Sequence, residues 1–241
     1  MDFLRWLFEA TIPVGGTVLV VREVVGNIFG LASALGGMRR KVWAWPVGII
    51  GNLLLLTVFV GSLFGDVDQA NLLGQAGRQI MFIAVSVYGW VQWRTARKQL
   101  QERQADSDPS TAITPKWASG KTRLVLTATM IVGTLAITPL FRMLGSYEPV
   151  WADAWTFVGS LLATYGMAKG WVEFWLIWVA VDAVGVPLLF AAGYYATAFM
   201  YLFYGMFTLI GFFVWARAQR NAKPQIETLL PDPTIQRATG K

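Results

Sequence analysis

Seven long apolar runs constrain this chain more than any other feature of its sequence. They cover residues 18–37, 43–64, 72–93, 123–143, 153–170, 172–191 and 195–217. Each is close to the roughly 20 residues that a helix needs to cross a bilayer core of about 30 Å. Such runs are too long and too continuously apolar for barrel strands, and backbone polar groups cannot stay unpaired in lipid. The sequence therefore predicts an all-α membrane protein with seven transmembrane helices.

Composition supports a membrane protein and argues against most enzyme classes. Hydrophobic residues make up 55% of the chain and charged residues 14%, whereas soluble domains carry about 25% charged residues. The chain has no histidine and no cysteine, which removes the usual ligands of zinc, copper, haem and iron–sulfur centres. Intramembrane chemistry normally needs a metal, a histidine base or paired acids. We therefore expect no metal, no cofactor and no catalytic residue, and we predict that the chain is not an enzyme.

The net charge of +6 has a topological explanation. If the seven helices alternate in direction, all but four of the twenty Lys and Arg residues fall on one side of the membrane, the exceptions being Arg5, Arg22, Arg78 and Arg142. The positive-inside rule then places the N-terminus outside and the C-terminus in the cytoplasm. We expect no nucleic-acid partner.

Polar segments separate the apolar runs into units. The stretch 94–122 is predicted to be a cytoplasmic linker that starts as a helical extension of the third run. The N-terminal residues 1–12 place apolar side chains at near-helical spacing, so we expect an amphipathic interfacial segment there. The predicted units are an N-terminal amphipathic segment (1–17), a first three-helix repeat (18–93), the linker (94–122), a linker transmembrane helix (123–143), a second three-helix repeat (153–217) and a disordered cytoplasmic tail (218–241).

The two predicted repeats share residues at a fixed offset of 130. The matched pairs are Glu23 and Asp153, Gly36 and Gly166, Arg39 and Lys169, Trp45 and Trp175, and Asn52 and Asp182. The third helices match when a shorter loop is allowed, because Gly89 and Trp93 then correspond to Gly211 and Trp215. Four membrane crossings separate the start of the first repeat from the start of the second, so both repeats run in the same direction through the membrane. This predicts parallel repeats in a 3+1+3 arrangement, with a substrate site near the midplane between them.

Polar residues at equivalent places in both halves are the first candidates for that site. An Asp at the centre of a membrane helix costs roughly 2.5–3.5 kcal/mol on insertion scales and usually faces a cavity or a partner. We expect Asn52 and Asp182 to approach each other, with Trp45 and Trp175 two helical turns away. Aromatic planes with a few hydrogen-bonding groups suit a flat polar heterocycle. The alternative is that the tryptophans belong to the interfacial aromatic belt and that Asn52 bridges helices.

The remaining candidates extend this site along neighbouring helices. Gln79 lies beside Arg78, whose guanidinium we expect to snorkel to the outer surface. Thr156, Ser160 and Thr164 recur every four residues and form a polar stripe. This stripe either lines the substrate path or packs helices together. Glu173 is interpreted as a first-turn acid that complements a helix dipole. The further candidate substrate-binding residues are Tyr88, Thr156, Ser160, Thr164, Trp178 and Tyr201.

Several motifs resemble the Pnu-type vitamin transporters. The strings are WAWPVGIIGN at 43–52, YGWVQW at 88–93, EFWLIWVAVD at 173–182 and the run from Gly193 to Trp215. The resemblance covers about residues 20–217. It implies a 3+1+3 helical fold like a full-length version of the SWEET fold, assembled as a homotrimer. It also implies facilitated diffusion of a vitamin precursor, with trapping by a cytoplasmic kinase.

Two positions distinguish branches within that family. In the nicotinamide riboside and thiamine branches a Gln stands eleven residues before the Trp of a Glu-Asn-Trp motif. This chain has Thr164 in place of that Gln and Phe174 in place of that Asn. The stretches REVVGNIFG, GMRRKVWAWP, GQAGRQIMFI and ATYGMAKGWVEFW look most like the riboflavin-transporting branch called RibM or PnuX. The resemblance therefore implies a riboflavin carrier.

Facilitated diffusion (uniport) of riboflavin, with trapping by phosphorylation in the cytoplasm, is the leading hypothesis. No second carboxylate or histidine lies at the level of Asp182 to relay a proton, which argues against ion coupling. The runner-up is a nicotinamide riboside or thiamine uniporter of the same family. A ligand sensor that signals through residues 94–122, and an intramembrane enzyme, are the remote alternatives.

Overall fold

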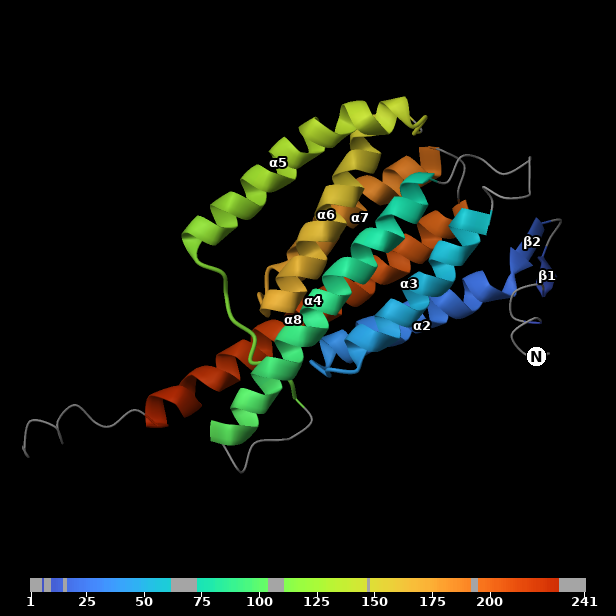
Figure 1. Ribbon diagram of the computed structural model, residues 1–241. Helices are drawn as coiled ribbons and strands as arrows, with labels where there is room; N and C mark the ends of the chain where they lie inside the picture. The colour runs from blue at the N-terminus through green and yellow to red at the C-terminus, as the bar shows by residue number, and fades with distance from the viewer. Residues whose placement is uncertain are drawn as a thin grey trace, which may run out of the picture.

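The computed structural model of the chain describes residues 6, 10–14, 17–61, 73–103, 111–146, 148–191 and 195–229 (Figure 1). Within these residues a two-stranded hairpin precedes a bundle of long helices. The elements are β1 (Thr11–Val14), β2 (Thr17–Val20), α2 (Val21–Met38), α3 (Ala44–Gly61), α4 (Leu73–Arg103), α5 (Gly120–Met143), α6 (Val150–Lys169), α7 (Phe174–Ala191) and α8 (Tyr195–Leu229).

Each of the seven predicted apolar runs corresponds to one helix, which confirms the prediction of an all-α bundle of seven. α5 and residues 201–222 of α8 are each long and apolar enough to cross a membrane. Both carry large apolar side chains that are exposed in the isolated chain, such as Leu124, Leu135 and Phe213. Such surfaces suit contact with lipid tails.

The N-terminal segment differs from the prediction. Thr11 pairs with Val20 and Val14 with Thr17 in an antiparallel hairpin, so the near-helical spacing of 1–12 does not continue as a helix at its end. Thr, Ile and Val are β-branched or β-favouring residues, and two glycines separate the two runs in the sequence, which is a hairpin signal. Residues 1–5, 7–9, 15 and 16 of the predicted segment lie outside the described residues.

Both polar extensions are helical. α4 continues to Arg103, as expected for a linker that begins as an extension of the third run. α8 continues to Leu229, so the prediction of a disordered tail from residue 218 is wrong for its first part. The stretch 216–222 is rich in Ala, Arg and Gln, which favour helix. The rest of the tail, 230–241, lies outside the described residues.

Packing divides the helices into two groups of three. In the first group, α3 packs between α2 and α4; in the second, α7 packs between α6 and α8. α4 lies along α6 and joins the groups, whereas α2 and α8 touch at few positions. α5 runs along the outside of α6, at the edge of the bundle (Figure 1).

The main hydrophobic core lies at one end of the bundle, where α2 and α6 end and α3, α5 and α7 begin. It is an aromatic cluster built around Trp45, Trp93, Phe174, Trp175 and Trp215. A segment that precedes α5, residues 111–119, lies across this end and contributes the buried Ala112 to the cluster. We call this segment the strap and this end of the bundle the strap end.

Candidate functional site

Trp45 and Trp175 occupy matching places in the two helix groups. Trp45 packs edge to face on Trp93, with ring centroids 5.2 Å apart, and its ring fills the notch left by Gly89. Trp175 packs on Trp215 at 6.2 Å and fills the notch left by Gly211. Both tryptophans are only 3% exposed. Each therefore serves as a core residue that locks the second helix of its group to the third.

The two tryptophan pairs also join the groups to each other. The rings of Trp93 and Trp215 lie 6.2 Å apart. The Trp93 indole N–H donates to the carbonyl of Met167 on α6, at 3.2 Å. The Trp215 indole N–H donates to the carbonyl of Met38 on α2, at 3.0 Å. The third helix of each group is thus hydrogen-bonded to the first helix of the other group at the strap end.

Four predicted site residues carry buried polar atoms that lack a hydrogen-bond partner within the described residues. These are Nε1 of Trp45, Nε1 of Trp175, Oε1 of Gln79 and Oδ2 of Asp182. Buried polar atoms are nearly always paired in folded proteins, and leaving one unpaired costs about 1–3 kcal/mol. Two of these atoms are hydrogen-bond donors and two are acceptors.

Asp182 lies on α7 against α8. A Cβ atom on Gly205 would be 3.4 Å from the Asp182 carboxylate, so the glycine leaves space beside the acid. Asn52 is half-buried on α3. Within the described residues α3 and α7 are not a packed pair of helices, and the approach of Asn52 to Asp182 stays a prediction.

Arg78 does not snorkel to the surface, contrary to the prediction. Its Nη2 donates to Oδ1 of Asp153 at 3.1 Å and to Oγ1 of Thr156 at 3.2 Å. Oδ2 of Asp153 accepts a hydrogen bond from Ser146 at 3.0 Å. An ion pair between α4 and α6, 75 residues apart in the sequence, therefore satisfies the charge. Helical spacing alone could not reveal a partner on another helix.

The polar stripe of α6 is buried and bonds mainly to its own helix. The hydroxyl of Ser160 donates to the carbonyl of Thr156, and the hydroxyl of Thr164 donates to that of Ser160. Thr156 also faces the other helices of its own group: a Cβ atom on Gly185 of α7 would be 3.4 Å from its methyl group and 3.2 Å from the ring of Tyr201 on α8. The structure thus brings Thr156 and Tyr201 together around a glycine of α7.

Tyr88 and Trp178 lie where the two groups meet. Tyr88 stacks on Tyr165 of α6 at 5.8 Å, and Nζ of Lys169 lies 5.2 Å and 5.4 Å from the two ring centroids. Trp178 faces Phe82 of α4 at 6.3 Å. Both candidates are therefore interface residues between α4 and the second group.

Glu173 has a different role from the one predicted. It precedes α7 and is buried, and its carboxylate accepts the backbone N–H of Ala118 at 3.1 and 3.0 Å. Nε of Arg123 on α5 lies 2.7 Å from Oε1 of the same carboxylate. Glu173 therefore anchors the strap and the start of α5 rather than only complementing a helix dipole. Its partners Ala118 and Arg123 lie 55 and 50 residues earlier in the chain, so no local sequence signal could have identified them.

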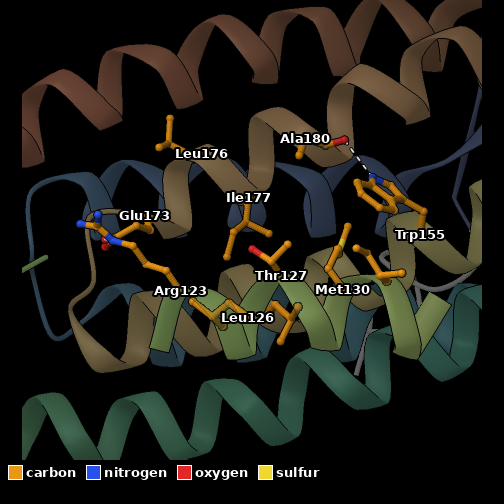
Figure 2. Close-up of a pocket in the computed structure, with 11 residues that line it drawn as sticks. Arg123, Leu126, Thr127, Met130, Trp155, Glu173, Leu176, Ile177 and Ala180 are labelled. Carbon is orange, nitrogen blue, oxygen red and sulfur yellow. Dashed lines mark hydrogen bonds and ion pairs between the residues drawn. The ribbon is translucent and has the colours of Figure 1, made fainter. Parts of the chain in front are cut away.

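A groove of about 300 Å³ lies between α5 and the pair α6–α7 (Figure 2). Its walls are mainly apolar, including Leu126, Met130 and Ile177. Three of its polar side chains are already paired, since Arg123 meets Glu173 and the Trp155 indole donates to the carbonyl of Ala180 at 2.9 Å. No predicted site residue lines it. We therefore do not assign it as the substrate site.

The chain is similar along most of its length to known transporters. Residues 20–217 match the family model described as nicotinamide mononucleotide transporter. The riboflavin/roseoflavin transporter RibM of Streptomyces davaonensis is 36% identical, over 93% of this chain and 98% of that protein. The nicotinamide riboside transporter PnuC of Escherichia coli is 25% identical, over 92% and 97%. The crystal structure of the vitamin B3 transporter PnuC has the same fold, with a TM-score of 0.64 at 20% identity over 83% and 82% of the two chains.

Proposed function

This chain belongs to the nicotinamide mononucleotide transporter family, and from that premise we propose that it carries riboflavin across the membrane by facilitated diffusion. The observation that carries the proposal is the 36% identity to the riboflavin/roseoflavin transporter over nearly the whole of both chains. The nicotinamide riboside transporter matches 92% of the chain at 25% identity.

The two branch-specific positions support the same cargo. Phe174 is buried in the aromatic cluster, 4.4 Å from Trp175 and 4.9 Å from Trp215 between ring centroids. Thr164 bonds to its own helix. Neither position offers an amide to a ligand. The pyridine amide of nicotinamide riboside and the aminopyrimidine of thiamine would therefore lack an amide partner at these positions.

The unpaired buried atoms include both donors and acceptors, which is the mixture that a riboflavin site requires. Its ribityl hydroxyls and ring N–H can donate to Asp182 and Gln79, and its ring carbonyls can accept from Trp45 and Trp175. The nearby cations are already engaged, because Arg78 pairs with Asp153 and Lys169 lies over Tyr88. The proposed cargo is therefore the free vitamin, and phosphorylation inside the cell would trap it.

We further propose that α2–α4 and α6–α8 are parallel repeats on either side of α5, in the 3+1+3 arrangement of a full-length SWEET-like fold. The matched packing of Trp45 and Trp175, and the reciprocal bonds of Trp93 and Trp215, support this symmetry. The proposed assembly is a homotrimer in the bacterial inner membrane. Because most basic residues fall on one side of the predicted helices, we propose that the strap end and the C-terminus lie in the cytoplasm and the N-terminus outside.

Radiolabelled riboflavin uptake into liposomes that contain the purified protein tests the function. We expect flux that equilibrates without a proton or sodium gradient and that unlabelled riboflavin blocks, whereas nicotinamide riboside and thiamine do not. Flux of nicotinamide riboside without flavin flux would establish the alternative cargo, for which the similarity to the PnuC proteins is the specific support. Flavin binding without flux would indicate a sensor.

A further inference from the structure

The groove between α5 and the pair α6–α7 is elongated and runs along the helices. On α5 its lining positions have the spacing of one helical face from Arg123 to Ile131, so that helix forms a wall about 12 Å long. The first turns of α7 supply part of the facing wall. Figure 2 shows Arg123 and Glu173 at one end of the groove and Trp155 at the other. The groove is therefore apolar along its length, with an ion pair at one end.

The sides of this groove belong to the surface that faces the bilayer. α5 is long and apolar enough to cross a membrane. Two residues that line the groove, Ile131 of α5 and Leu176 of α7, are 51% and 43% exposed in the isolated chain. Apolar surface of this kind is covered by lipid tails when a helix lies in a bilayer. The groove is therefore accessible from the side, to molecules of the membrane itself.

Arg123 supplies a fixed positive charge at one end of the groove. It lies in the first turn of α5, where a membrane-spanning helix meets the bilayer boundary. Its Nε is 2.7 Å from the Glu173 carboxylate, and its guanidinium lies 5.5 Å from the ring centroid of Trp117. The side chain is still 53% exposed. A guanidinium presents a fork of N–H donors that fits phosphate oxygens, and these contacts hold that fork in place.

We propose that this groove binds one molecule of an anionic phospholipid. One acyl chain lies between α5 and α7, and the headgroup phosphate is bound by Arg123 at the bilayer boundary. Basic pockets between membrane helices are suited to anionic headgroups. Lys121 is exposed in the same first turn and adds positive charge at that end. This inference needs a membrane but no particular cargo, so it does not depend on riboflavin transport.

Charge favours a lipid over a second copy of the chain as the occupant. A copy in the same membrane orientation would bring its own strap end to the level of Arg123. The exposed residues described there include Arg39 and Arg94, so like charges would meet. An anionic headgroup instead gives the opposite charge at that level, and its acyl chain points into the bilayer along the groove.

Photocrosslinking in nanodiscs is the first test. Full-length protein is placed in phosphatidylcholine with a small fraction of phosphatidylglycerol whose acyl chain carries a diazirine, and labelled residues are identified by peptide mass spectrometry. Phosphatidylcholine with the same label is the headgroup control. We expect labels at Leu126, Met130 and Ile177, with phosphatidylglycerol labelling them about fivefold more, which is the effect of one Lys or Arg on an anionic lipid.

Matched variants separate the groove from the rest of the surface. Thr127 lines the groove and is exposed, so Thr127→Trp fills the groove without entering the core. The neighbouring Ala128 is exposed and does not line the groove, so Ala128→Trp is its control. We expect Thr127→Trp to abolish groove labelling and Ala128→Trp to leave it unchanged.

The headgroup contact is tested by charge. Arg123→Gln should remove the about fivefold preference for phosphatidylglycerol, whereas Lys98→Gln, on a side chain that is 79% exposed, should keep it. Because Arg123 also pairs with Glu173, the Tm of each variant is measured alongside. If Arg123→Gln does not fold, Thr127→Trp still decides whether the groove holds the lipid.

Three results would overturn the proposal. Equal labelling by the two lipids in the parent protein would mean that the groove has no headgroup site. Groove labelling that survives Thr127→Trp would place the lipid elsewhere. A smaller oligomer for Thr127→Trp by mass photometry, with no groove labelling of the parent, would make the groove a contact between copies. Absence of riboflavin flux, with groove labelling intact, would instead overturn only the proposed function.

Discussion

Gly89 and Gly211 leave room for the rings of Trp45 and Trp175. A Cβ atom at either position would collide with Trp45 or Trp175. We therefore predict that Gly211→Ala lowers the free energy of unfolding by about 1–3 kcal/mol, as overpacking does in other cores, with a lower Tm in detergent. Gly30→Ala is the control, since a Cβ atom there meets nothing within 4 Å and alanine favours helix. Equal Tm values for the two variants would contradict this packing.

Asp182, unlike these glycines, should lower the stability of the fold, because its carboxylate has an unpaired oxygen. We expect the same carboxylate to contribute to substrate binding. Asp182→Asn keeps the shape and removes the charge, and hydrogen bonds to charged groups contribute about 1.5–3 kcal/mol. We predict that the riboflavin Kd rises about 10- to 100-fold, measured by quenching of flavin fluorescence, while Tm does not fall. Glu148→Gln, on a side chain that is 70% exposed, should leave both unchanged. An unchanged Kd for Asp182→Asn would remove Asp182 from the site.

At the scale of helices, one ion pair fixes α4 against α6. The side chains of Arg78 and Asp153 are 11% and 28% exposed. Removing one partner of a buried pair costs about 3–5 kcal/mol. Because Asp153 is partly exposed, we expect Arg78→Met to lower the free energy of unfolding by about 3 kcal/mol or less. We predict a clear fall in Tm. Lys98→Met is the control, because Lys98 and Glu102 are 79% and 63% exposed and such pairs contribute about 0–1 kcal/mol. Similar Tm changes would show that the α4–α6 pair is solvated.

At the scale of the whole molecule, reciprocal tryptophan bonds hold the two groups together at the strap end. Trp215→Phe removes the indole donor to the partly buried carbonyl of Met38. We predict that it speeds maleimide labelling of Ala112→Cys, because the groups separate more readily. Trp155→Phe loses an equivalent bond to Ala180 inside one group. It should lower Tm without changing the labelling rate, and equal labelling in both backgrounds would argue against coupling between the groups.

The sequence by itself determined the seven helices, because the length of an apolar run and the absence of polar breaks decide what can cross a bilayer. It also identified the matched pairs Trp45 and Trp175, and Gly89 and Gly211, whose equivalent packing the structure shows. The resemblance to the riboflavin-transporting branch also came from sequence motifs alone, and the 36% identity to a riboflavin/roseoflavin transporter agrees with it.

Only the tertiary structure decided which side chains meet. The partner of Arg78 is an acid on another helix, the anchor of the strap is Glu173, and the N–H of Ala112 finds a carbonyl 72 residues earlier in the chain at Arg40. Periodicity places a residue on a face of its own helix, but the rotation and spacing of the neighbouring helices determine what that face contacts. The role of an ionisable or backbone group therefore follows from packing across the bundle, which local sequence does not encode.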